Sequence, residues 1–425
     1  MKKLLLILLA LMPMSVFAEV LNGANTSWIL TSTVLVLFMT LPGLALFYGG
    51  LVRSKNILSV LMQCFAIAGI VSVLWLVAGY SIAFAEGNAY FGSLSKFMLL
   101  GVLEGSLSGD IPESLFALFQ MTFAIITPAL IIGGFAERMK FSAVLLFSSI
   151  WLIVVYAPIT HWVWGGGWLQ EMGLLDFAGG TVVHITAGVG ALVAAIVLGP
   201  RNGFPSTPML PHNMTMTITG AGMLWVGWFG FNGGSALAAN GDAAMAMLVT
   251  HISAAAAAMT WMFYEWVKFG KPTALGTVTG MVAGLGTITP ASGFVGPAGA
   301  LVIGILAGLI CFNAVILIKQ KFKIDDSLDV FPVHGVGGAL GTLLAGVFAS
   351  SELGLFSGQG LVEGMTIASQ VGVQAVGVIA VFVYTAIATY VILKVVDMIT
   401  GLRVTAEEEQ QGLDIALHEE TGYNL

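Results

Sequence analysis

Eleven long apolar segments constrain the fold of this chain more than any other feature of its sequence. A helix that crosses a bilayer needs about 20 mostly apolar residues, because it rises about 1.5 Å per residue. Only 9% of the residues are charged, far below the share usual in soluble domains. We therefore predict an all-α polytopic membrane protein with eleven transmembrane helices. The expected spans are about 27–51, 57–84, 113–136, 140–160, 177–199, 214–233, 243–266, 273–289, 296–318, 330–350 and 363–397.

The positions of the basic residues orient these spans. Cytoplasmic loops of membrane proteins are enriched in Lys and Arg. If the N-terminus lies outside and the C-terminus inside, Lys96 is the only Lys or Arg in the outer loops. The side then predicted to be cytoplasmic, which comprises loops, the ends of spans and the tail, contains Arg53, Lys55, Arg138, Lys140, Arg201, Lys268, Lys271, Lys319, Lys321, Lys323, Lys394 and Arg403.

The chain divides into three parts. Residues 1–18 are typical of a cleaved signal peptide, with Lys2 and Lys3 before a short apolar core and Val16-Phe17-Ala18 at the expected cleavage site. An uncleaved anchor is the alternative. Residues 19–399 form the membrane domain. Residues 400–425 form a cytoplasmic tail rich in glutamate, whose simplest interpretation is a solvated, partly disordered end.

Two histidines occupy equivalent places in the two halves of the chain. Asp176 precedes His184 by eight residues in D-F-A-G-G-T-V-V-H, and Asp326 precedes His334 by the same offset. These histidines lie in spans five and ten. Because five is odd, the two halves have opposite orientations, which predicts an inverted 5+5 repeat followed by one long helix. Small residues share the face of each histidine, so the helices can approach closely. These are Ala187, Gly188, Ala191, Ala195, Gly337, Gly338, Gly341 and Ala345.

An ionisable group inside a bilayer is costly, so the two histidines, one in each half, form a candidate functional site. A metal site is poorly supported, because neither cysteine nor a third histidine has ligand spacing with them. Cys64 and Cys311 lie in apolar segments and predict no disulfide. We expect no cofactor and no nucleic-acid partner. The sequence shows no nucleophile or metal constellation for an intramembrane enzyme.

The segments D-F-A-G-G-T-V-V-H and F-P-V-H-G-V-G-G resemble the two histidine motifs of the ammonium transporter family (Amt/MEP/Rh). The resemblance covers nearly the whole chain. It implies a homotrimer of eleven-helix bundles with one pore per subunit, in a bacterial inner membrane. It also implies an ammonium/ammonia channel or transporter, with a cytoplasmic PII-type signalling protein as a partner. Alternatives are an ammonium sensor that signals through the tail and an Rh-like gas channel.

The same resemblance assigns roles to seven residues. His184 and His334 would line the pore, and Phe123 and Phe231 would form a hydrophobic gate above them. Phe123, Trp164 and Ser235 would form an outer ammonium site that Asp176 supports. From sequence alone, an aromatic residue in an apolar helix is usually core. We expect Asp176 to cap its helix through the N–H of Ala178 or Gly179, too far along the helix to lie beside His184.

Overall fold

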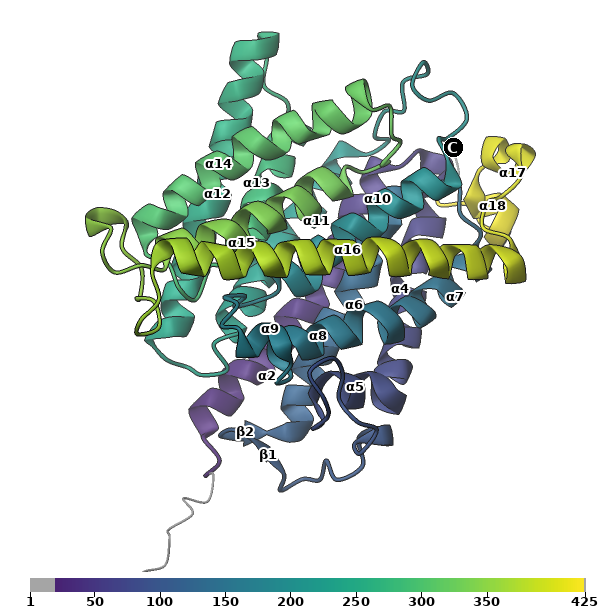
Figure 1. Ribbon diagram of the computed structural model, residues 1–425. Helices are drawn as coiled ribbons and strands as arrows, with labels where there is room; N and C mark the ends of the chain where they lie inside the picture. The colour runs from purple at the N-terminus through teal and green to yellow at the C-terminus, as the bar shows by residue number, and fades with distance from the viewer. Residues whose placement is uncertain (1–19, 424–425) are drawn as a thin grey trace, which may run out of the picture.

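The computed structural model describes residues 20–423, so the predicted signal peptide lies outside the described residues. The described part is a bundle of long helices with one short antiparallel pair of strands, β1 (Leu107–Ser108) and β2 (Ile111–Pro112) (Figure 1). The α-helices are α2 (Gly23–Phe38), α3 (Ala45–Leu51), α4 (Ile57–Leu74), α5 (Tyr80–Phe84), α6 (Glu113–Phe135), α7 (Phe141–Trp151), α8 (Ala157–Trp164), α9 (Trp168–Glu171), α10 (Thr186–Leu198), α11 (Met214–Trp228), α12 (Gly241–Phe269), α13 (Ala274–Ile288), α14 (Pro297–Ile316), α15 (Gly337–Phe348), α16 (Ile367–Thr400), α17 (Ala406–Gln411) and α18 (Leu413–His418). Turns of π-helix adjoin them at Met39–Leu44, Trp75–Gly79, Leu152–Tyr156, Gly180–Ile185, Phe229–Gly233, Leu317–Lys321 and Phe331–Val336.

Each predicted span corresponds to a helical stretch, so the all-α membrane class is confirmed. Within residues 20–423, nine helices are long and apolar enough to cross a membrane. The two remaining expected spans are α13, which has 15 residues, and α11 together with its π-helical turn at 214–233. The count of eleven membrane spans and the orientation of the termini stay predictions.

Three of the loops predicted to be cytoplasmic, at 52–56, 136–140 and 199–213, contact the tail at one end of the bundle. The start of α2 and the strands lie away from α17 and α18 (Figure 1). Arg53 and Arg201 both pair with Glu137, at 2.7 and 3.1 Å, and Arg201 also pairs with Asp325 at 2.8 Å. Burial alone would raise the pKa of Glu137, but the two arginines hold it below its ordinary value. These four residues come from separate loops, so ion pairs hold this end of the bundle together.

The tail packs against this end of the bundle and is ordered through residue 423. Glu409 and Asp414 are each only 2% exposed. The Glu409 carboxylate accepts a hydrogen bond from the Asn202 N–H at 2.7 Å and pairs with Arg403 at 2.9 Å. Asp414 accepts a hydrogen bond from the Ser59 N–H at 2.8 Å. The expectation of a solvated end therefore does not describe α17 and α18, because Glu409 binds the loop at Asn202 and Asp414 binds the start of α4 at Ser59.

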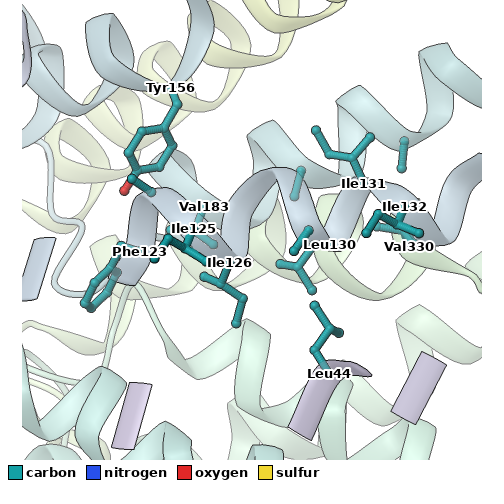
Figure 2. Close-up of a cluster of buried hydrophobic side chains, with 14 of the residues drawn as sticks. Leu44, Phe123, Ile125, Ile126, Leu130, Ile131, Ile132, Tyr156, Val183 and Val330 are labelled. Atoms are coloured by element: carbon teal, nitrogen blue, oxygen red, sulfur yellow. The ribbon is translucent and has the colours of Figure 1, made fainter. Parts of the chain in front are cut away.

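Helix α6 runs through the core, and its side chains pack against several spans. Ile126 and Leu130 point toward Leu44, whereas Tyr156 lies on the other side of α6 (Figure 2). The small residues bring α10 and the π-helical turn Phe331–Val336 into contact. A Cβ built on Gly188 would lie 2.3 Å from the nitrogen of Gly335, so only glycine permits this approach.

Candidate functional site

Three cavities follow one another through the bundle. The first, which we call the Trp164 cavity, has a volume of about 190 Å³ and is lined by Phe123, Trp164 and Ser235 among others. The second, the histidine cavity, encloses only about 10 Å³ and is lined by Phe231, His184 and His334 among others. The third, the Asp329 cavity, has about 310 Å³, also touches His334, and is bordered by Lys319 and Asp329. The smallest space thus surrounds the histidines.

Two aromatic rings separate the Trp164 cavity from the histidine cavity. The ring centroids of Phe123 and Phe231 lie 4.2 Å apart, and both side chains are only 1% exposed. Trp164 stands edge-on to Phe123 at 6.1 Å. Because the two rings are in close, tilted contact across this passage, with an interplanar angle of 35°, a molecule can pass only if a ring moves. The structure therefore brings together the residues expected to form the gate and the outer site.

Trp164 and Ser235 present groups that suit a small cation. The Trp164 indole N–H donates to the main-chain oxygen of Asp176 at 2.8 Å, which fixes the ring beside the cavity. The Ser235 hydroxyl donates to the Phe231 carbonyl at 2.8 Å, so the lone pairs of its oxygen remain free to accept. A ring face and a hydroxyl acceptor can together recognise a cation with N–H groups.

Asp176 acts as a cap and makes no contact with the Trp164 cavity. Its carboxylate accepts the N–H groups of Gly179 at 2.8 Å, Gly180 at 2.6 Å and Thr181 at 2.8 Å. It also accepts the Thr181 hydroxyl. Gly179 fits the expected cap, whereas Ala178 makes no such bond. Asp176 is 5% exposed, and its carboxylate is held by the chain itself, so it acts on its surroundings through its charge and the cap.

The two histidines meet at the centre of the bundle. His184 and His334 lie in π-helical turns that occupy equivalent places in the two halves, Gly180–Ile185 and Phe331–Val336. Their Nδ1 atoms are 3.1 Å apart, and the rings are nearly parallel, with centroids 5.2 Å apart. One neutral imidazole can therefore donate to the other. The His184 Nε2 has no hydrogen-bond partner among residues 20–423, so the pair keeps a free polar atom.

Asp326 differs from Asp176 although each lies eight residues before its histidine. One of its oxygens accepts the Phe331 N–H at 2.7 Å, and the other finds no partner in the described part of the chain. Burial, and after it the nearby Asp329, raises the pKa of Asp326 to about 7. Asp329 pairs with Lys319 at 2.8 Å. The end of the path at the Asp329 cavity therefore carries several closely spaced charges.

Metal-binding constellations are absent from the described residues: no group of three or more His, Cys, Asp or Glu side chains lies together in a suitable arrangement. Cys64 and Cys311 are both buried free thiols. Apart from the charged groups at the Asp329 cavity, the path is lined by apolar groups, amides, hydroxyls and imidazoles.

Two glutamines near the site escaped the sequence-based expectations. Gln120 lines the Trp164 cavity, and Gln374 on α16 binds the main chain just before Asp176. Amides within apolar spans are a detectable signal, because a buried polar group requires partners. Gln120 also lies three residues before Phe123, on the same helical face, so its place beside the predicted site could have been inferred.

Comparisons with known proteins agree with one another. Residues 27–423 match the model of the Ammonium Transporter Family. An ammonium transporter of Bacillus subtilis is 48% identical over 401 residues, covering 94% of this chain and 98% of the relative. The ammonium transporter Amt1 of Archaeoglobus fulgidus is 44% identical over 404 residues, covering 95% and 100%.

Two solved structures share the fold. Mep2 of Saccharomyces cerevisiae has a TM-score of 0.83 and 38% identity, with 91% of each chain covered. A protein described as a sensor Amt protein has a TM-score of 0.86 and 31% identity, covering 93% of this chain and 98% of its own. Both likenesses extend over nearly the whole membrane domain.

Proposed function

This chain belongs to the ammonium transporter family, and from that premise we propose that it moves ammonium nitrogen across the bacterial inner membrane as a channel or transporter. The observation that carries the proposal is the row of cavities. The Trp164 cavity, two phenylalanine rings in close contact and two hydrogen-bonded imidazoles follow one another along one path. Such a path suits a small solute that can change its charge.

We propose that ammonium binds in the Trp164 cavity, loses a proton and passes the histidines as ammonia. Moving a bare ion into a medium of low dielectric constant costs on the order of 20 kcal/mol in the idealised limit. Releasing a proton at pH 7 from an amine-like cation, with a pKa of about 10, costs roughly 4 kcal/mol. Deprotonation is thus the less costly route. The proton either returns to the outer side or crosses separately, giving neutral or electrogenic transport.

Flux through purified protein tests this function. Liposomes carrying the protein should show an ammonium-dependent current or internal pH change that empty liposomes lack. Absence of both signals in correctly folded protein would refute the transport proposal. Recording current and pH together distinguishes net movement of charge from movement of ammonia alone.

An ammonium sensor is the second candidate. Its support is the likeness to the protein described as a sensor Amt protein, and the packing of the tail against the loops. A sensor would bind ammonium with a change at the tail but little flux. An Rh-like gas channel is less favoured, because Trp164 and Ser235 form a cavity suited to a cation.

We also propose that three copies assemble, and an exposed histidine supports an interface between copies. His251 on α12 is exposed on the outside of this protomer, and its ring lies 5.2 Å from that of Trp225 on α11. An ionisable side chain directed into lipid is costly, so a neighbouring subunit would cover it favourably. Native mass spectrometry of the purified protein should give the trimer mass; a monomer alone would refute this assembly.

A further inference from the structure

Gln120 shares a helical face with two phenylalanines that line the Trp164 cavity. Phe116, Gln120 and Phe123 are spaced four and three residues apart on α6, which places them on one face. All three line this cavity. Gln120 lies one turn from Phe123, about 4.5 Å along the helix toward the end of α6 where the strands lie. It therefore lies beside the part of the cavity where ammonium would arrive before it reaches the gate.

The amide of Gln120 has an unmet hydrogen-bonding capacity. The side chain is only 8% exposed, and its Oε1 atom is buried without a partner among the described residues. Leaving a buried acceptor unpaired is unfavourable, and most buried polar atoms in native proteins are paired. Gln374 shows the contrast, because its Oε1 and Nε2 atoms both bind main-chain groups. The acceptor of Gln120 therefore lacks the structural partner that Gln374 has.

We propose that the Gln120 amide oxygen accepts a hydrogen bond from an ammonium ion in the Trp164 cavity and helps to set its affinity. This inference rests on the proposed function. Ammonium carries four N–H groups, whereas Ser235 offers one hydroxyl acceptor and the rings offer only their faces. The terminal torsion of a glutamine amide is broad, so the oxygen can turn toward the cavity without movement of α6.

Two substitutions at Gln120 test the proposal in liposomes. Gln120→Met keeps the length of the side chain and removes the acceptor. It should raise the half-saturating ammonium concentration roughly tenfold, the scale of one hydrogen bond to a charged group. Gln120→Glu adds a negative charge at the same place and should lower that concentration several-fold. The glutamate variant keeps the proposal testable if the methionine variant does not fold.

Gln63 provides a matched control. It lies on α4, is 2% exposed and also has a buried Oε1 atom without a partner, but it does not line the Trp164 cavity. Gln63→Met should leave the concentration dependence unchanged. An unchanged half-saturation in Gln120→Met, or an equal shift in Gln63→Met, would overturn the inference while transport by the wild type still stands. Loss of all flux in the wild type would instead refute the proposed function and this inference with it.

Discussion

At the scale of single residues, Asp176 and Asp326 show how one sequence pattern produces two different sites. Both acids lie eight residues before a histidine. The carboxylate of Asp176 is surrounded by N–H groups and a hydroxyl, whereas one oxygen of Asp326 has no partner in the described part of the chain. The spacing could be read from the sequence. The surrounding donors depend on how the chain turns at Gly179, whose φ of 113° no spacing rule predicts.

We expect Asp176→Ala to abolish ammonium transport. The change removes the cap of the π-helical turn that carries His184 and takes a negative charge from beside the cation path. Loss of a helix cap alone costs about 0.5–2 kcal/mol. Asp176→Asn separates the two effects, because it keeps an oxygen acceptor for the cap without the charge. Asp176→Glu keeps the charge and should retain a little flux. Full activity of well-folded Asp176→Ala protein in liposomes would remove this residue from the mechanism.

The raised pKa of Asp326 predicts how the stability of the protein depends on pH. Its pKa in the folded protein is about 7, above the ordinary value of 3.8. The folded state therefore binds this proton more tightly than the unfolded state does. The stability that this group contributes is complete below about pH 4 and is lost as the pH rises toward 7.

Asp326→Asn should remove this loss, because an amide accepts the Phe331 N–H without carrying a charge. The variant should gain stability over the wild type on the order of a few kcal/mol at pH 8, and less at pH 5. Thermal unfolding of both detergent-solubilised proteins across this range measures the difference. A difference that does not grow with pH would show that Asp326 is ionised throughout the range.

At the scale of elements, the sequence was sufficient to predict where the helices lie but not how their ends and turns are built. Apolar length located each span, because it follows directly from the thickness of a bilayer. Turns of π-helix arise from tertiary packing, so apolar periodicity could not reveal those around His184 and His334. The contact between Gln374 and Leu175 also arises from tertiary packing. Since 199 residues separate the two, the sequence did not reveal it.

The contact of Gln374 with Leu175 predicts a positioning role for α16. Gln374 accepts the Leu175 N–H at 2.8 Å and donates to the carbonyls of Leu175 at 2.7 Å and Thr342 at 2.8 Å. Gln374→Leu should therefore loosen the segment before Asp176, whose carbonyl fixes Trp164. We expect a roughly tenfold higher half-saturating ammonium concentration, the scale of losing paired buried groups.

Tyr384→Phe is the control for this prediction, because it also removes a hydrogen bond from α16 to another main chain, at Val154, away from the cavities. Its ammonium dependence should match the wild type. Tyr384→Phe can lower the maximal flux only by reducing the amount of folded protein. If Gln374→Leu likewise lowers only the maximal flux, Gln374 stabilises the bundle without positioning the site.

At the scale of the whole molecule, two histidines far apart in the sequence meet, as the predicted inverted repeat would require. Each half contributes one histidine in a π-helical turn, and Gly188 brings the turn that holds His334 against α10. The offset and the span number predicted two histidines at equivalent places, and the family resemblance predicted that they pair; the inverted repeat stays a prediction. Gln120 was overlooked although its spacing placed it on the same helical face as Phe123; the structure was needed to show that this face lines a cavity.

The charged end of the bundle supports our last prediction, a complex with a trimeric PII-type signalling protein. Lys321 and Lys323 are exposed, and the nearby Asp329 cavity has a volume of about 310 Å³. A loop of the partner that carries charges of both signs could enter this mouth. A three-fold partner would suit a three-fold channel, because three weak contacts then act together.

Co-purification with PII protein should compare the full-length chain with a chain truncated after Thr400 and with Lys321→Ala/Lys323→Ala. The truncation removes α17 and α18, so it frees the Ser59 N–H and the Asn202 N–H from their acidic partners. We expect the full-length channel to retain PII and both variants to retain less. If no form retains PII under varied nucleotide and metabolite conditions, the partner assignment fails. Equal retention by the full-length and truncated chains would mean that the loops bind PII without the tail, since the Asp329 cavity does not include α17 or α18.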